Sequence, residues 1–187
     1  MDVHLIVPEG IDDPRRPSGG NTYDRRVAQG LAELGWVVHE HDISAVAGIP
    51  DDAVVLLDGL IASPAPDVLV PHARRLRQVV LMHMPIGDAR EHAVLEAATA
   101  VITTSAWTRR RLVELYGLPL DRIHVAEPGV DPAEPAPASA TGGALVCVAA
   151  VTPHKGHDVL LDALATVPEL SWHCTCVGSL DRDPEWA

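Results

Sequence analysis

The amino-acid sequence predicts an α/β protein in which a parallel sheet is covered by helices on both faces. Short apolar segments alternate with segments of helical periodicity throughout residues 1–130. Most of these segments, such as residues 53–57 (AVVLL), lack an alternation of apolar and polar residues, as is typical of strands buried on both faces of a parallel sheet. A Pro- and Ala-rich stretch over residues 131–141 precedes one more strand–helix–strand pattern over residues 142–187. We therefore expect one α/β domain, a linker, and the first β-α-β unit of a second domain.

The first predicted helix follows a short strand and a polar loop. Residues 3–7 predict the strand, and the Pro-rich residues 8–18 predict the loop. Gly19 leads into the helix, and Gly35 is placed to end it. The apolar face of this helix is formed at helical spacing by Val27, Leu31 and Leu34.

The remaining elements of the first domain continue the alternation. Ser105 is expected to cap a helix that Gly117 closes, with Pro119 just beyond. The other elements are expected as strands over residues 37–41, 53–57, 78–84, 100–104 and 123–126, and as a helix over residues 89–98. Ligands of such sheets bind at the carboxyl ends of the strands.

Residues 142–187 predict two strands, over residues 144–151 and 172–177, with a helix between them. One such unit is too small to bury a core of its own. Its sheet edges and its apolar face are therefore expected to seek a partner, and we expect self-association through this region.

Composition limits the class of protein. The chain has 187 residues, 47% of them hydrophobic, and its mean hydropathy of +0.12 fits a soluble protein. Its formal charge of −12 argues against nucleic-acid binding, which needs clustered Lys and Arg. No apolar segment approaches a membrane-spanning length, and no basic region follows Met1, so we expect a cytoplasmic protein.

The cysteines and histidines give no familiar metal spacing. Three cysteines, in apolar strand-like segments, predict buried thiols in a reducing compartment. The histidine pairs 39/41 and 154/157 lack a carboxylate or cysteine at the usual spacing. We therefore expect no metal site. Scarce aromatic residues include Trp107 and Trp172, whose spacing predicts core positions.

Several candidate ligand-binding residues follow predicted strands. Gly19 and Gly20 would let a ligand approach the backbone at a helix N-terminus, although taken alone they are better explained by an ordinary flexible turn. His83 ends an apolar strand and could contact a sugar hydroxyl or transfer a proton, or be a core histidine. The same choice between ligand contact and a structural role applies to Asn21, Asp58 and Ser105.

Lys155 and Gly156 lie between a Thr-Pro turn and an amphipathic segment. A lysine beside a helix N-terminus can bind a diphosphate as a point charge, and an exposed surface lysine is an equally good alternative. The sequence has neither a Gly-x-Ser-x-Gly elbow nor a Walker lysine loop.

Taken together, these motifs resemble the retaining glycosyltransferases of family 4, which have the GT-B fold. The resemblance covers essentially the whole chain, in the family's order. It rests on residues 18–26 (SGGNTYDRR) with the following residues 31–35 (LAELG), on residues 101–109 (VITTSAWTR), on residues 127–131 (EPGVD) and on residues 151–158 (VTPHKGHD).

The resemblance implies two Rossmann-like domains with a nucleotide-diphosphate sugar between them, the first mainly shaping the acceptor site. It implies that Gly19, Gly20, Lys155 and Gly178 bind the donor phosphates and that His83 lies near the transferred sugar. It implies hexose transfer to an acceptor hydroxyl with retention, and no metal or other cofactor.

Two features depart from the family pattern. Alanines at positions 149 and 150 replace an arginine that many members place before the lysine. The family's pair of glutamates that holds the donor belongs further along than Ala187, so we expect the 187-residue chain alone to be inactive. A non-catalytic sugar- or partner-binding module and a GT-B nucleotide-sugar epimerase are the alternatives.

Overall fold

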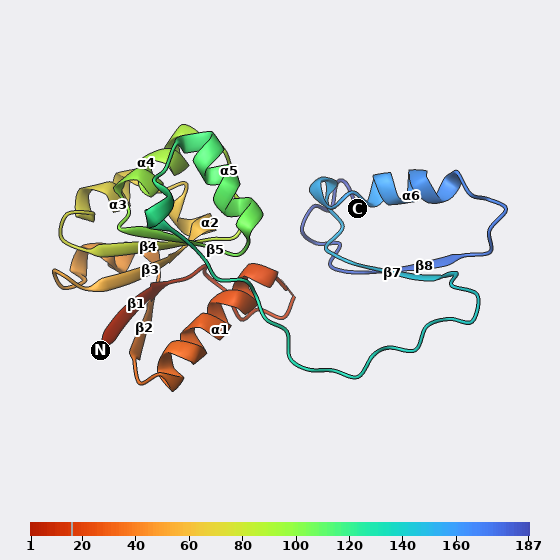
Figure 1. The fold of residues 1–187 in the computed structure, drawn as a ribbon, viewed down its shortest axis with the longest axis horizontal. Coiled ribbons are helices and arrows are strands. Elements are labelled where there is room, and N and C mark those ends of the chain that lie inside the picture. The colour runs from red at the N-terminus through yellow and green to blue at the C-terminus, as the bar shows by residue number, and fades with distance from the viewer. Residues whose placement is uncertain (16) are drawn as a thin grey trace. The chain divides into compact units, whose positions relative to one another are not determined.

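The computed structural model describes residues 1–15 and 17–187. The chain divides into a large unit, Met1–Asp12 with Ser18–Val130, and a small unit, Asp13–Pro17 with Asp131–Ala187 (Figure 1). Across the described residues, no helix is both long enough and apolar enough to cross a bilayer.

Six parallel strands form the sheet of the large unit, in the order β2-β1-β3-β4-β5-β6. Their order along the chain reverses beside β1, so the sheet has a topological switch point between β1 and β3. The strands are β1 (Asp2–Ile6), β2 (Val37–His41), β3 (Val54–Asp58), β4 (Arg77–Met82), β5 (Ala100–Thr103) and β6 (Ile123–Val125).

Helices cover both faces of this sheet, which confirms the predicted α/β class. Helix α1 (Gly19–Glu33) lies on one face, where Val27, Ala28 and Leu31 pack against a buried cluster that includes Leu5 and Leu56 (Figure 1). The larger cluster fills the other face. The elements that follow β2 are η1 (Ile43–Gly48), α2 (Gly59–Ala62), α3 (Pro66–Leu69), η2 (Val70–His72), α4 (Ala89–Ala97), α5 (Ala106–Tyr116) and η3 (Leu120–Arg122).

The predicted ends of α5 are confirmed. Ser105 Oγ accepts a hydrogen bond from the Thr108 backbone N–H at 3.0 Å, and Gly117 adopts a left-handed conformation with φ 65°. The expectation that Trp107 lies in the core is wrong, because its position in the first turn of α5 leaves it 56% exposed. The short helices over residues 43–72 were not expected, since they contain too few turns to produce a periodic pattern.

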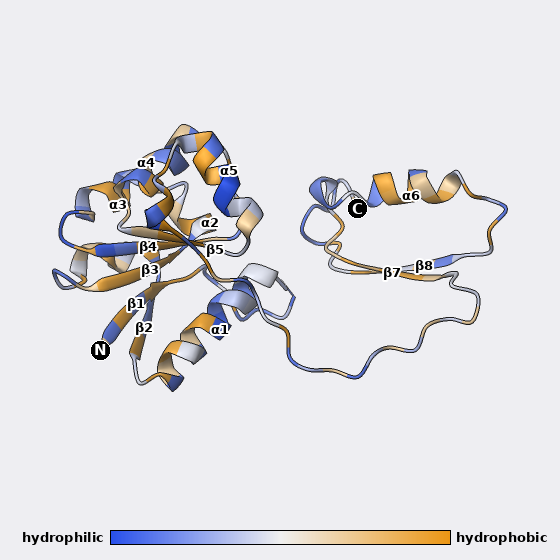
Figure 2. Cartoon of the chain, in the orientation of Figure 1, coloured by the Kyte–Doolittle hydropathy of each residue, from blue (hydrophilic) through white to orange (hydrophobic). Residues whose placement is uncertain are grey.

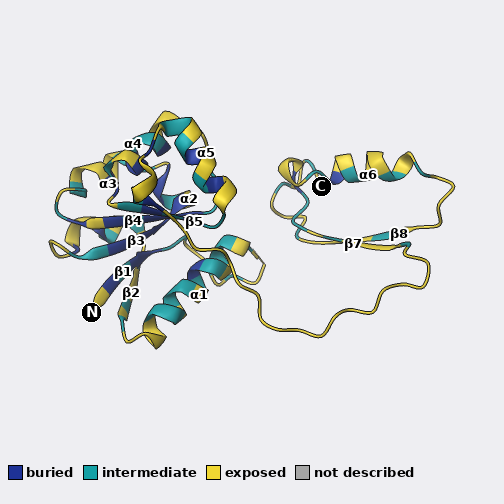
Figure 3. Ribbon diagram, viewed as in Figure 1, coloured by how far each residue is buried: buried dark blue, intermediate teal, exposed yellow. Residues whose placement is uncertain are grey.

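The small unit contains two parallel strands, β7 (Ala144–Val148) and β8 (His173–Val177), with η4 (Pro153–Lys155) and α6 (His157–Ala165) between them. β7 is apolar and β8 mixed, and both are mostly exposed, in contrast with the central strands β3 and β4 of the large unit (Figures 2 and 3). The expectation of buried cysteines is wrong here: Cys176 is exposed, while Cys147 and Cys174 are half-buried. Trp172 is also exposed, because it precedes β8.

Candidate functional site

The carboxyl ends of β3 and β4, next to the topological switch point, carry two of the predicted site residues. Asp58 is the last residue of β3, and His83 immediately follows β4. Helix α1, which follows β1, brings Asp24 to the same place. Open α/β sheets bind ligands at such a point, because adjacent loops there diverge to opposite faces of the sheet.

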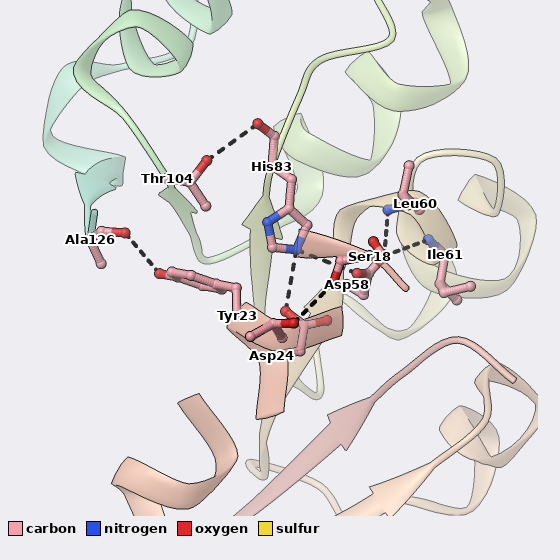
Figure 4. A network of polar contacts seen from close by, with 10 residues as sticks. Ser18, Tyr23, Asp24, Asp58, Leu60, Ile61, His83, Thr104 and Ala126 are labelled. Atoms are coloured by element: carbon pink, nitrogen blue, oxygen red, sulfur yellow. Dashed lines mark hydrogen bonds and ion pairs between the residues drawn. The ribbon is translucent and has the colours of Figure 1, made fainter. Parts of the chain in front are cut away.

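The His83 imidazole faces two carboxylates (Figure 4). Its Nε2 lies 3.3 Å from Asp24 Oδ1 and 3.5 Å from Asp58 Oδ2. The Asp24 and Asp58 side chains are almost fully buried, and that of His83 is 17% exposed. Asp24 Oδ1 and Oδ2 and Asp58 Oδ2 accept no conventional hydrogen bond from the described residues. His83 is thus the main compensation for two buried negative charges.

Asp58 is fixed by the start of the next helix. Its Oδ1 accepts hydrogen bonds from the backbone N–H groups of Leu60, at 2.7 Å, and Ile61, at 3.2 Å. Gly59 permits this tight turn, since a Cβ there would lie 2.9 Å from the Leu81 carbonyl oxygen. Asp58 therefore performs the structural role of a helix cap with one oxygen and faces His83 with the other.

The three ionisable groups shift one another's protonation. Burial opposes the charge on His83, yet Asp24 and Asp58 together raise its pKa to about 9. Burial, the largest cause, and the neighbouring Asp58 raise the pKa of Asp24 to about 6, although His83 acts in the opposite direction. Burial also acts against ionised Asp58, but His83 and Asp24 hold its pKa below the usual value. At neutral pH the histidine is therefore an imidazolium between carboxylates.

This arrangement leaves one proton donor on the histidine ring for another partner. Nε2 is turned toward the carboxylates, so Nδ1 lies on the other side of the ring (Figure 4). Thr104 Oγ1 donates a hydrogen bond to the His83 carbonyl oxygen at 3.3 Å and so holds the backbone of the residue. The site can donate a charge-assisted hydrogen bond to an anion or a sugar hydroxyl. Its three ligand atoms, all within 4.8 Å of one another, could alternatively hold a cation.

The two glycines at the start of α1 have different surroundings. A Cβ at Gly20 would lie 3.2 Å from His83 Cδ2, whereas a Cβ at Gly19 would meet nothing within 4 Å. Only Gly20 therefore lies against the histidine, and only there does the absence of a side chain make room for the ring.

Asn21 and Ser105 have structural partners. Asn21 Nδ2 donates to the Ile11 carbonyl oxygen at 3.0 Å and ties the preceding loop to α1. Ser105 Oγ caps α5 and lies 2.9 Å from Thr108 Oγ1. These contacts favour the structural alternative for both residues.

Sequence reasoning missed Asp24 and Tyr23. Asp24 lies three, four and seven residues before Val27, Ala28 and Leu31, so it belongs to the sheet-facing stripe of α1, where a carboxylate is conspicuous. The Tyr23 hydroxyl donates to the Ala126 carbonyl oxygen at 2.9 Å, and its ring packs edge-on against His83 with centroids 5.4 Å apart. Nothing in the spacing signalled Tyr23.

The other predicted residues lie in the small unit. Lys155 is exposed at the end of η4, and Gly156, with φ 69°, precedes α6. Gly178 follows β8, and a Cβ there would overlap the Ala149 carbonyl group. Lys155 thus precedes a helix N-terminus, as the sequence predicted, and Gly178 is required by the close approach of two backbone segments.

Each of three comparisons with known proteins finds a glycosyltransferase. Residues 2–134 match the family model described as Glycosyltransferase Family 4. A D-inositol 3-phosphate glycosyltransferase of Xylanimonas cellulosilytica is 34% identical over an alignment covering 42% of this chain and 23% of that protein. The crystal structure of a glycosyltransferase from Rickettsia africae superposes on 99% of this chain and 62% of its own, with a TM-score of 0.66 and 18% identity. The chain thus spans less than two thirds of the length of either protein.

Proposed function

The chain belongs to glycosyltransferase family 4, and from this premise we propose that it serves in the transfer of a hexose from a nucleotide-diphosphate sugar to an acceptor hydroxyl, with retention of configuration. The large unit would supply the acceptor side of the active site, and the small unit would begin the donor-binding domain. The observation that carries the proposal is His83, charged between two buried carboxylates at the switch point of the sheet.

A non-catalytic module explains this arrangement less well. Burying three ionisable groups costs free energy that an apolar cluster of the same size would not. Strongly shifted pKa values in one place are typical of functional sites. A module that binds a sugar through surface hydroxyls would not need a buried Asp24.

We assign His83 the role of a donor to the transferred sugar or to the departing diphosphate, through Nδ1–H. Asp24 and Asp58 are positioning residues, which keep the ring charged and oriented.

Lys155 would oppose the negative charge that develops on the diphosphate as its bond to the anomeric carbon breaks. Gly19, around whose Cβ position nothing lies within 4 Å, would admit a phosphate group close to the backbone, whereas Gly20 and Gly178 would shape the backbone beside it. No metal ion is needed in this proposal, because a cationic side chain, Lys155, is assigned to the diphosphate.

The first test assays the 187-residue chain, and any longer form that its gene encodes, with UDP-, GDP- and ADP-sugars and hydroxyl acceptors. Acceptor-dependent release of nucleotide by the longer form, undiminished by a chelator, is the expected result. No turnover with any donor would contradict the proposal, and robust turnover by the 187-residue chain would contradict its expected inactivity.

The second test separates the roles of the residues. His83→Gln should lower kcat/KM strongly, whereas His124→Gln, an exposed histidine on β6, should leave it unchanged. Asp24→Asn should move the alkaline limb of the pH profile to lower pH, because His83 loses a carboxylate that raises its pKa. An unmoved pH profile would remove the positioning role from Asp24.

The third test concerns the donor. Lys155→Ala should lower kcat/KM for the donor. The expected loss of transition-state stabilisation is about 2–4 kcal/mol. The apparent KM for the acceptor should change little. A loss of less than about threefold would identify Lys155 as an ordinary surface lysine.

A further inference from the structure

The small unit brings together two thiols and an imidazole from three different elements. Cys147 lies on β7, Cys176 on β8, and His157 is the first residue of α6. Cys147 Sγ is 3.8 Å from His157 Nε2, and the two sulfur atoms and this nitrogen all lie within 4.8 Å of one another. Nothing in the proposed sugar transfer uses these residues.

Local structure explains why they meet. Cys147 and Cys176 are register partners in the parallel ladder, so their side chains project from the same face of the two-stranded sheet. Gly156, in a left-handed conformation, turns the chain into α6 immediately before His157. The ring is thereby placed over the ends of both strands.

His157 is a buried polar group without a conventional partner. The residue is 7% exposed in a unit whose other side chains are mostly accessible. Its Nδ1 has no hydrogen-bond partner among the described residues, and its Nε2 faces sulfur rather than oxygen. Buried imidazoles normally satisfy their nitrogen atoms, so this ring needs an explanation that simple packing does not give.

We propose that Cys147, His157 and Cys176 bind one zinc ion or a closely similar thiophilic divalent cation. Two thiolates and an imidazole are a ligand set that zinc favours, and ligands of a tetrahedral zinc site must lie within a few ångströms of one another. Binding releases the two thiol protons and forms two metal–sulfur bonds and one metal–nitrogen bond, with no redox step. The fourth position is left to solvent or to a small ligand.

Such an ion would have a structural consequence for a unit with little core. It would link β7, α6 and β8. On β7, the outward-facing Val146 and Val148 are 70% and 76% exposed. Metal binding contributes directly to folding where apolar burial is insufficient. The sequence did not predict this site because its ligands are ten and nineteen residues apart, outside the familiar zinc spacings.

The test uses the 187-residue chain without an affinity tag, reduced and treated with a chelator, then titrated with Co²⁺ and Zn²⁺. We expect one ion per chain, the visible d–d bands of tetrahedral cobalt, and a thiolate-to-cobalt charge-transfer band in the near ultraviolet. Zinc should displace cobalt and abolish these bands. Absence of the charge-transfer band in the reduced wild-type chain would overturn the proposal.

Matched variants assign the ligands. Cys147→Ser, Cys176→Ser and His157→Gln should each weaken cobalt binding at least tenfold. The controls Cys174→Ser and His154→Gln, a neighbouring thiol and a neighbouring exposed histidine, should retain it. Equal loss in Cys174→Ser and Cys176→Ser would refute the three-ligand assignment.

A measurement on the wild-type chain tests the site without any variant, so it does not depend on whether a variant folds. X-ray absorption on the zinc-loaded wild-type chain should show two sulfur ligands and two nitrogen or oxygen ligands, and ligation without sulfur would overturn the site. None of these measurements involves glycosyl transfer, so they succeed or fail independently of the proposed function.

Discussion

Strands β3 and β7 have similarly apolar sequences but very different surroundings. In the large unit Val55 and Leu57 are fully buried, whereas in the small unit Val146 and Val148 are largely exposed. The difference lies in what covers each strand. β3 pairs with strands on both sides and has packed side chains on both faces, while β7 pairs with β8 and most side chains of α6 remain exposed. Local sequence thus determines that a strand forms, and the number of neighbouring elements determines how much free energy its burial contributes.

The largest effect expected from this difference is on stability. Leu57→Ala should destabilise the large unit by about 2–5 kcal/mol, because it leaves a cavity in a fully packed core. Val148→Ala should change the free energy of unfolding of the small unit by less than about 0.5 kcal/mol, since it removes exposed atoms. Urea unfolding of both variants, at a protein concentration too low for self-association, measures the contrast. Equal losses would mean that β7 is covered in solution as well as β3 is.

Electrostatics distinguish the units as well, because the large unit buries the Asp24–Asp58–His83 group. His83 has a pKa of about 9 in the folded chain against an ordinary value of 6.5, so its protonation favours the folded state. That stabilisation is complete below pH 6.5 and is lost as pH rises to 9. The loss should amount to at most about 3 kcal/mol in the free energy of unfolding of the large unit.

Unfolding curves at pH 6.5 and pH 9 measure this loss, and the matched variants are His83→Gln and His124→Gln. His83→Gln should flatten the pH dependence, whereas His124→Gln should leave it as in the wild type. In the wild type Asp24 titrates mainly below this window, since its pKa is about 6. A wild-type chain equally stable at both pH values would show that His83 is not held as an imidazolium.

The extent to which sequence predicted the structure differs between fold and site. The bounds of β2 and the glycine after α5 were predicted as observed, because two valines that follow the helix-ending Gly35 and a helix terminator at Gly117 are local signals. His83, Asp58 and Gly20 were predicted from the rule that ligands meet the carboxyl ends of strands. Their mutual contacts could not be predicted, since they depend on strand order and on the rotation of α1.

Residues that act through long-range contacts were the ones missed. Asp24 belongs to a helix, away from any strand end, and only the register of α1 against the sheet brings it to His83. Likewise Cys147 and Cys176 become neighbours only through the parallel pairing of β7 with β8. The number of residues between two positions cannot reveal such pairs, because the connections between their elements have no fixed length.

The smallest expected effect concerns association through the small unit, which remains a prediction. In the register of β7 and β8, Val146 and Val148 project opposite to Cys147, and Val148 pairs with Val177, which is also exposed. Exposed apolar faces and unpaired edges favour contact between chains. We therefore expect the 187-residue chain to form dimers or larger assemblies at high concentration.

Replacing Val146 and Val148 together by lysine should raise the dissociation constant at least tenfold, which corresponds to about 1.4 kcal/mol. Val68→Lys and Val70→Lys, at exposed positions of the large unit, provide the control. Light scattering over a concentration series decides the outcome: a wild-type chain that stays monomeric throughout would show that the exposed face of β7 is tolerated in water.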